Sequence, residues 1–448
     1  MGPKRTAWYK QLYRRLRQEL RWLTPGLGIK RWVFVIILGT TLLGVGIGMG
    51  LLDIYRTAPD TWWLPITSAL YLNFLSRALR VIVFGTIGIG LVLVGIWGLN
   101  RSLLKPFVKP GSKSIVQAVS DFRRKERGPR IVAIGGGTGL SSLLRGLKDY
   151  TSNLTAIVTV ADDGGSSGEL RRSIGILPPG DIRNCLTALS DDEALMSQIF
   201  QYRFAAGAGL NGHTLGNLFI TALADITGSF EEAVAESGRV LAVKGRVLPA
   251  TLHDIRLAAD VQVGEAEVEV QVHGESQIPK AAGKVRRVWM EPDNPAAFPP
   301  SVQALLSADL IVVGPGSLYT SIIPNLLVPD IAAAFKASRA LKLYIVNVAT
   351  QNGETDHYTC ADHVHTVEKY LGGPVFDVVV CNKVNENSRS DSVEWVPVDE
   401  DIDQKYATYV ANLVDEVSPW RHDSKKLGQA VMDLYYERTG PLVGRDEG

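Results

Sequence analysis

A glycine-rich stretch in the middle of the chain has the residue types and spacing of an anion-binding turn. It follows the apolar run Ile131–Ile134, precedes a helical pattern of leucines, and consists of Gly135, Gly136, Gly137, Thr138 and Gly139. Glycines at a strand-to-helix turn let main-chain N–H groups approach a phosphate, and the positive end of the following helix points to the same place. The stretch is neither a G-x-G-x-x-G motif nor a P-loop, because Ser142 stands at the third glycine position and no lysine follows. We predict nucleotide or sugar-nucleotide binding here, with a plain strand–helix turn as the alternative.

A pair of carboxylates follows the next apolar run, Leu154–Val160. Asp162 and Asp163 stand where an acid accepts hydrogen bonds from ribose hydroxyls in dinucleotide-binding folds. They could instead hold a divalent metal on a diphosphate, or Asp162 could simply cap the turn. The residues after them add flexible backbone donors and the hydroxyls of Ser166 and Ser167, which makes a second anion-binding loop.

Further polar residues gather at the starts of predicted helices and form the rest of the candidate binding site. These residues are Asp181, Arg183, Asn184, Asn217, Gly314, Gly316 and Ser317. The last three follow the apolar run Leu310–Val313 and repeat the strand–glycine–helix arrangement. His213 is a possible catalytic base, but no serine or cysteine is spaced to suggest a triad with it. We therefore name no catalytic residue and no metal ligand.

The elements that position these loops are those of an α/β protein with a doubly wound, Rossmann-like parallel sheet. Short apolar runs alternate with helical stretches, and two glycine junctions on one parallel sheet would both lie at the carboxyl ends of strands, where open sheets bind ligands. Alternating valines in residues 246–290 predict a small antiparallel insertion. The tail over residues 401–438 is predicted to be helical.

The N-terminal region has the composition of a membrane anchor. Residues 32–52 and 81–99 are two uncharged apolar runs, and 21 helical residues span about 31 Å, close to the thickness of a hydrocarbon core. Nine basic residues precede the first run and nine lie in residues 101–130, so the positive-inside rule predicts a transmembrane hairpin with both ends in the cytoplasm. We predict an anchor over residues 1–110 that starts with a basic amphipathic helix, a linker over 111–130, and one domain over 131–448.

The overall composition narrows the function further. The formal net charge is +1, and the three cysteines lack disulfide or zinc spacing, which fits a reducing compartment. We expect no nucleic-acid partner, contact with inner-membrane lipid, and a possible homo-oligomer.

Seven segments in order resemble the CofD-like superfamily, and within it the YvcK-type branch of gluconeogenesis factors. They are GGGTGLSSLLRGLK (135–148), VTVADDGGSSGELRR (158–172), GILPPGDIRNCLTAL (175–189), NGHTLGNL (211–218), GRVLPAT (245–251), GPGSLYTSIIPNLLV (314–328) and NVATQNGETDHYT (347–359).

The resemblance implies a Rossmann-like domain that binds a nucleotide sugar such as UDP-N-acetylglucosamine. It implies a regulatory role in cell shape and cell-wall precursor metabolism during gluconeogenic growth, with no cofactor required. The related CofD branch implies the alternative, a transferase that moves a phospholactate-type group from a nucleotide-linked donor with Mg²⁺. Enzymatic activity is therefore left open, with the binding regulator favoured, and a nicotinamide-dependent oxidoreductase is the third possibility. The anchor over residues 1–110 is expected to have no counterpart in the family, and it predicts a cytoplasmic domain held at the inner membrane.

Overall fold

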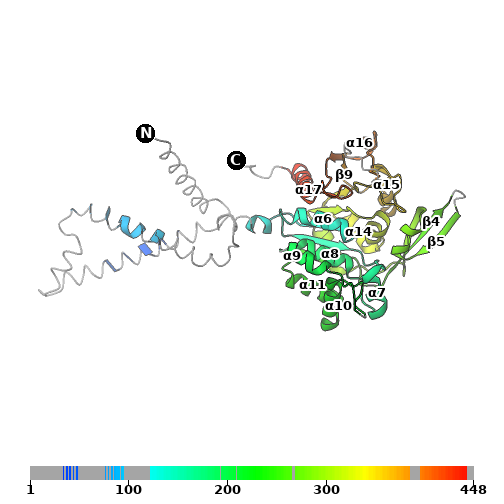
Figure 1. Cartoon of the computed structure of the whole chain (residues 1–448). Helices are drawn as coiled ribbons and strands as arrows, with labels where there is room; N and C mark the ends of the chain where they lie inside the picture. The colour runs from blue at the N-terminus through cyan, green and yellow to red at the C-terminus, as the bar shows by residue number, and fades with distance from the viewer. Residues whose placement is uncertain are drawn as a thin grey trace, which may run out of the picture. The chain divides into compact units, whose positions relative to one another are not determined.

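Figure 1 shows the computed structural model of the chain. It describes residues 122–440 apart from 192, 208, 265–267 and 384–393, together with scattered positions between 34 and 94. The chain divides into two compact units, Met1–Arg124 and Lys125–Gly448. The division falls inside the stretch predicted as a linker, residues 111–130.

The second unit is built on a parallel seven-stranded sheet, in agreement with the predicted fold class. The strand order is β10-β9-β8-β7-β1-β2-β3, and every described pairing in it is parallel. The strands are β1 (Ile131–Gly135), β2 (Leu154–Val158), β3 (Arg246–Pro249), β7 (Leu310–Val313), β8 (Leu341–Ile345), β9 (Val378–Asn382) and β10 (Thr408–Ala411).

The central strands form because they are short, nearly continuous apolar runs, as expected for strands covered on both faces. Every residue of β1, β2, β7 and β9 is buried. From β1 the chain moves outward to β2 and β3, and then returns to the other side of β1 with β7. This reversal is the topological switch point of a Rossmann-like sheet, and ligands bind at the carboxyl ends of the strands there.

The helices of the second unit form two packed groups. In one, α6 packs on α17 and α8, and contacts continue through α9 and α10 to α11; in the other, α14 packs on α12 and α13. The helices are α6 (Thr138–Leu147), α7 (Gly165–Ile174), α8 (Gly180–Leu189), α9 (Glu193–Gln201), α10 (Leu215–Thr227), α11 (Phe230–Val240), α12 (Pro299–Ser307), α13 (Ile323–Leu326), α14 (Pro329–Ala337), α15 (Cys360–Leu371), α16 (Ile402–Lys405) and α17 (Ser424–Thr439). Single turns of other helix types are η3 (Glu275–Gln277), η4 (Pro279–Ala281) and the π-helical η5 (Leu318–Ile322).

A small antiparallel sheet is inserted between α11 and α12, as predicted. Its order is β5-β4-β6, with β4 (Arg256–Val263), β5 (Val268–His273) and β6 (Lys284–Glu291), and β4 and β5 form a projecting arm (Figure 1). The predicted start of the insertion was wrong, because β3 pairs with β2 and is the edge strand of the parallel sheet.

The prediction of a helical tail was also only partly right. Helices α16 and α17 are present, but β10 lies between them and adds the last strand next to β9. The stretch Thr408–Ala411 is half-exposed and carries no strong apolar alternation, so only its pairing with β9 makes it a strand.

The first unit is described at few positions, and the predicted membrane runs lie largely outside them. The described positions within residues 34–48 and 79–94 are helical, and their large apolar side chains are exposed. Among the described residues, no single helix is both long and apolar enough to cross a membrane. One sharply bent pair, Leu318–Leu326 with Pro329–Ala337, passes the same criteria by length and composition and includes many buried core residues.

Close contact between α6 and α17 depends on two glycines. A β-carbon on Gly146 would lie 2.9 Å from the Gly428 Cα and would also collide with the Ser424 carbonyl. We predict that Gly146→Ala lowers the free energy of unfolding by about 1–3 kcal/mol, because overpacked backbone must shift. Chemical denaturation of the full chain measures this. Gly238→Ala in α11 is the matched control, since its nearest non-neighbouring atom lies 3.8 Å away, and equal effects of the two changes would contradict the prediction.

Candidate functional site

The two glycine loops lie side by side at the switch point of the sheet. They follow β1 and β7, which are paired in parallel. A β-carbon on Gly139 would lie 2.9 Å from the Gly316 Cα, so the loops are in direct contact. Asn325 ties the first loop down by donating to the Gly135 carbonyl at 3.0 Å. The structure thus places both predicted loops at one edge of the sheet.

The glycines of these loops mainly allow other protein atoms to pack closely against the backbone, and they do not form an open phosphate-binding turn. A β-carbon on Gly137 would lie 2.6 Å from the Asp181 Cα, and one on Gly136 would strike Ser321. The Gly137 N–H donates to the Asp181 carboxylate, and the Gly316 N–H donates to Asn347 Oδ1 at 3.0 Å. The expectation that main-chain amides of both loops are free to hold a phosphate is therefore wrong for Gly137 and Gly316.

Three helix N-termini supply positive potential at the same edge. Helices α6, α7 and α8 begin there, and in none of them does the N-cap residue's own side chain bond to the helix. Gly164 is the cap residue of α7, and Gly180, the first residue of α8, packs against Ser167 and Asp162. A helix N-terminus carries a partial positive charge, which favours anions nearby.

Several carboxylates stand beside these helix ends. Asp162 accepts a hydrogen bond from the Gly164 N–H at 2.9 Å and another from Ser167. Asp163 accepts from the Ser276 N–H at 2.9 Å, so the insertion reaches the site through the turn after β5. The acidic cluster of the site consists of Asp162, Asp163, Asp181, Glu275 and Glu354.

Burial and mutual repulsion make this cluster hard to ionise completely. Burial, followed by repulsion from Asp162, raises the pKa of Asp181 to about 7. Burial also raises the pKa of Glu275 to about 8, with added repulsion from the four other members of the cluster. The pKa of Glu354 is raised to about 6, again mainly by burial. Each further negative charge at this edge of the sheet is therefore favourable only when a proton or a cation accompanies it.

A directed chain of hydrogen bonds joins Arg183 to His213. Arg183 donates to Asn217 Oδ1 at 3.0 Å, and Asn217 Nδ2 donates to Ser166 Oγ at 3.0 Å. Ser166 Oγ also forms a hydrogen bond with His213 Nδ1, 3.0 Å away, in which the His213 tautomer decides the donor. The other ring nitrogen of His213 lies 3.5 Å from a carboxylate oxygen of Glu169. The sequence spacing did not indicate this neighbour of His213, because folding is what brings Ser166 to it.

This chain of hydrogen bonds positions side chains and does not form a nucleophile. Ser166 is only 7% exposed, and both of its hydrogen-bonding roles are filled. Arg183 retains binding capacity, because its Nε is buried without a hydrogen-bond partner in the structure. Its second terminal nitrogen donates to Asn184 Oδ1 at 2.9 Å. Burial, with repulsion from Arg203, lowers the Arg183 pKa, so a nearby anion would stabilise its charged form.

The described residues contain no group of three or more His, Cys, Asp or Glu side chains arranged to hold a metal ion. Mg²⁺ is commonly held by one or two carboxylates together with the phosphates of a substrate. Asp162 and Asp181 have the right chemistry for such a shared site, since both are half-buried and near each other. The residues therefore fit Mg²⁺ only as a companion of a phosphate ligand.

The predicted loop residues lie at this edge, and residues 350–356 were also expected to border it, but the groups that brace the loops were not named as site residues. Gln351 donates to Ser317 Oγ at 2.7 Å, and Asn347 bonds both the N–H and the carbonyl of Gly316. Both follow β8, so polar residues after a buried strand were the available signal. Glu275 gave no such signal, because it follows an antiparallel strand of the insertion.

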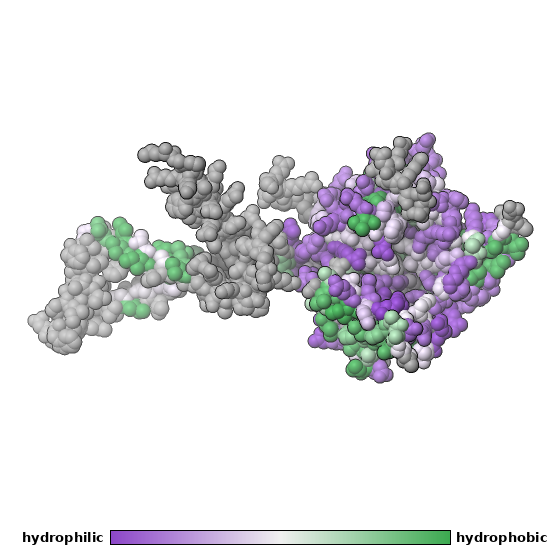
Figure 2. Space-filling view, viewed as in Figure 1, coloured by the Kyte–Doolittle hydropathy of each residue, from purple (hydrophilic) through white to green (hydrophobic). Residues whose placement is uncertain are grey.

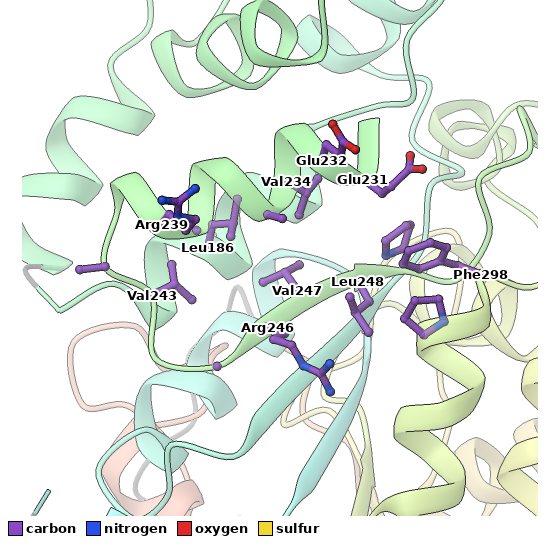
Figure 3. Close-up of a pocket in the computed structure, with 16 residues that line it drawn as sticks. Leu186, Glu231, Glu232, Val234, Arg239, Val243, Arg246, Val247, Leu248 and Phe298 are labelled. Atoms are coloured by element: carbon purple, nitrogen blue, oxygen red, sulfur yellow. The ribbon is translucent and has the colours of Figure 1, made fainter. Parts of the chain in front are cut away.

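A cavity of about 560 Å³ lies elsewhere, between α11, β3 and the start of α12 (Figure 3). Its walls are largely apolar and include Val234, Val247 and Phe298. None of the residues predicted for the binding site lines it. The candidate site is thus an assembly of half-buried groups at the sheet edge and does not coincide with this cavity.

Comparison with known proteins identifies relatives of the chain. Residues 131–417 match a family model described as 2-phospho-L-lactate transferase CofD. The gluconeogenesis factor of Bacillus subtilis is 46% identical over 318 residues, which cover 69% of this chain and 99% of that protein. A crystal structure of a UPF0052 family protein from Bacillus halodurans has a TM-score of 0.64 and 44% identity, and covers 68% of this chain and 99% of that one.

Longer relatives change the interpretation of the N-terminal region. A protein of Nostoc sp. named "Putative gluconeogenesis factor" is 45% identical over 437 residues, 94% of this chain and 93% of its own length. One of the same name from Clostridium acetobutylicum is 40% identical over 442 residues, with 93% of each chain covered. These matches extend into residues 1–110, so the expectation that this region lacks a counterpart in the family was wrong.

The raised pKa of Asp181 predicts that this residue destabilises the fold at high pH. In the unfolded chain the carboxyl ionises near 3.8, whereas in the folded chain its pKa is about 7. Between these values the unfolded state releases the proton and the folded state keeps it, so stability falls as the pH rises. Asp181→Asn should leave stability near that of the parent at pH 4 and raise it at pH 8, on the order of a few kcal/mol at about 1.4 kcal/mol per pKa unit.

Urea denaturation of the full chain at the two pH values measures this effect. Asn can still accept the Gly137 N–H, so the variant removes the charge and retains the acceptor. Asp225→Asn, at an exposed position of α10, is the control and should behave alike at both pH values. A destabilised Asp181→Asn at pH 8 would overturn the assignment.

Proposed function

The chain belongs to the CofD family, and from this we propose that its second unit binds a nucleoside diphosphate sugar, such as UDP-N-acetylglucosamine, at the carboxyl edge of the parallel sheet. The observation that carries the proposal is the convergence of two glycine loops, three helix N-termini and Arg183 at the switch point. Helix N-termini and a partly unpartnered guanidinium are complementary to phosphate oxygens. The half-buried Asn184 beside them offers an amide to sugar and ribose hydroxyls, while the buried Asn217 and Ser167 hold neighbouring side chains in place.

We propose that the bound nucleotide sugar is sensed and not consumed. Ser166 is buried in a filled hydrogen-bond chain, and burial raises the pKa of the Cys185 thiol well above its ordinary value. These candidate nucleophiles therefore do not present an exposed, ionised atom to a substrate. With relatives named gluconeogenesis factors, the role proposed is regulation of cell-wall precursor metabolism and cell shape during gluconeogenic growth.

The alternative function is a transferase that acts on a nucleotide-linked phosphoester. Asp181 and Glu275 favour it, because a carboxyl with a pKa of about 7 or 8 can exchange protons at physiological pH. Such chemistry would use Mg²⁺ to neutralise the phosphates beside Asp162. A regulator would need the metal at most as a companion of its ligand. The two functions therefore differ in whether the bound molecule is converted to a product.

The N-terminal region is proposed to anchor the domain to the inner membrane through a helical hairpin. At the described positions both runs are helical with exposed apolar side chains, as lipid contact requires. The hydroxyls of Thr41 and Thr86 donate to the carbonyls of Ile37 and Ile82, four residues earlier. These polar groups are thus satisfied within their own helices, which is the arrangement that suits a bilayer.

We predict that the full chain binds UDP-N-acetylglucosamine and that Arg183→Gln weakens binding about 10- to 100-fold. A charge-assisted hydrogen bond contributes about 1.5–3 kcal/mol, which corresponds to that range. Without metal, affinity should fall between pH 6 and pH 8, because Asp181 and Glu275 ionise and repel the diphosphate. Mg²⁺ should reduce this loss. Isothermal titration calorimetry in detergent, with and without Mg²⁺, measures each effect.

Arg239→Gln is the matched control, because Arg239 is exposed on α11 and pairs only with Glu236 among the described residues. Its affinity should equal that of the parent. Titrations with GDP and NAD under the same conditions distinguish the alternatives. Metal-dependent GDP binding with turnover of a linked phosphoester would support the transferase, and NAD binding without nucleotide-sugar binding would favour an oxidoreductase.

The membrane arrangement has its own test. A reporter fused after Arg130 should be active only when it is of the kind that works in the cytoplasm, and the full chain should sediment with membranes. A chain that starts at residue 111 should lose membrane sedimentation. Activity of a periplasmic reporter at the same position would refute the proposed hairpin without affecting the binding proposal.

A further inference from the structure

Strand β5 presents an open edge on the projecting arm of the second unit (Figure 1). Among the described strands it pairs only with β4, whereas β6 on the other side of β4 is covered by Tyr370, whose hydroxyl accepts from the Val288 N–H at 2.8 Å. Five of the six residues of β5 are exposed. An uncovered edge strand offers a row of unpaired N–H and C=O groups to another strand.

The register of the arm shows which backbone groups of β5 face outward. The Gly274 N–H donates to the Leu257 carbonyl at 2.7 Å, so this opposed pair is a hydrogen-bonded one. Hydrogen-bonded and non-hydrogen-bonded pairs alternate along an antiparallel ladder. The valines at even positions of β5 therefore direct their backbone groups to β4. The outward backbone groups belong to Glu269, Gln271 and His273.

The side chains of β5 form one apolar and one polar face. Val268 is 57% exposed and Val270 is 43% exposed, and their strip on the arm is visible in Figure 2. The opposite face carries Glu269, Gln271 and His273. Exposed valines on an unpaired edge favour pairing with another apolar strand.

The sequence of β5 is complementary to itself in one antiparallel register. If Gln271 lies opposite Gln271 of another copy, then Glu269 lies opposite His273 on the polar face, and this pair occurs twice. His273 Nδ1 also lies 3.3 Å from Glu291 of its own chain, so it would be placed between two carboxylates. On the apolar face Val270 lies opposite Val272. The residues paired directly across the axis are also those with outward backbone groups, so hydrogen bonding and side-chain complementarity select the same register.

We propose that β5 pairs with β5 of a second copy of this chain, antiparallel and with Gln271 on the two-fold axis. The two arms then form one continuous six-stranded sheet, which is a closed, isologous interface. β5 leads directly into Gly274 and Glu275, and the Ser276 N–H holds Asp163. Pairing of the arms thus fixes the segment that carries Glu275 and holds Asp163 in each copy.

Cysteine cross-linking of the full chain tests the register. Gln271→Cys should give a disulfide-linked dimer under mild oxidation, because the Cα atoms of a hydrogen-bonded antiparallel pair lie about 5.5 Å apart, within the disulfide range. The native Cys185, Cys360 and Cys381 are buried, so the parent should stay uncross-linked. Glu269→Cys alone should also fail, since it faces His273, whereas Glu269→Cys with His273→Cys should cross-link.

A charge exchange tests the side-chain complementarity. Glu269→Arg should reduce the dimer fraction at least about 10-fold, and adding His273→Glu should restore it, since two opposite-charge pairs form again. Light scattering of the full chain in detergent measures the mass. Gln271→Pro should abolish the dimer, because it removes an outward N–H, while urea denaturation should show that the fold remains.

Two results would overturn the proposal. One is a monomeric parent chain at micromolar concentration, and the other is cross-linking of Glu269→Cys as efficient as that of Gln271→Cys. Cross-linking of Val270→Cys alone with itself would place the axis one residue away and would refute the stated register.

Discussion

The parallel pairing of β1 with β7 is the constraint on which the candidate site depends. These strands are neighbours in space but are separated by the whole β2–β6 segment in sequence, so the chain must reverse its direction of winding between them. Because of this reversal, no helix crosses between the loop that follows β1 and the loop that follows β7. The polar groups of the site surround these two loops, and they include Glu275, which comes from the insertion.

The electrostatics of the site balance two opposed demands. Helix N-termini and Arg183 favour an anion, while the acidic cluster disfavours one. A site with only the first property would bind any phosphate, and one with only the second would bind a cation. Together they favour a ligand whose phosphates arrive with a cation or with protonated carboxyls, which is more selective than either alone.

The parts of the fold that the sequence predicted are those set by local apolar patterning. Strands β1 and β7 were predicted within one residue because each is a continuous apolar run. Strands β3 and β10 were missed because neighbouring strands, and not their own side chains, make them strands. In the site, loop residues carry a local glycine signal, whereas the contacts of Ser166 with His213 and of Asp163 with Ser276 join residues far apart in sequence.

The role of Gly137 shows why a motif alone underdetermines chemistry. A glycine after a strand is required wherever something approaches the backbone closely, and the sequence does not say whether a phosphate or a protein atom does so. Here the close neighbour is Asp181, whose carboxylate also receives the Gly137 N–H. A group that neutralises or displaces this carboxylate must act on the loop as well as on the charge. A ligand of the proposed kind that acted on Asp181 would therefore also act on the loop, which is the linkage that the proposed sensing requires.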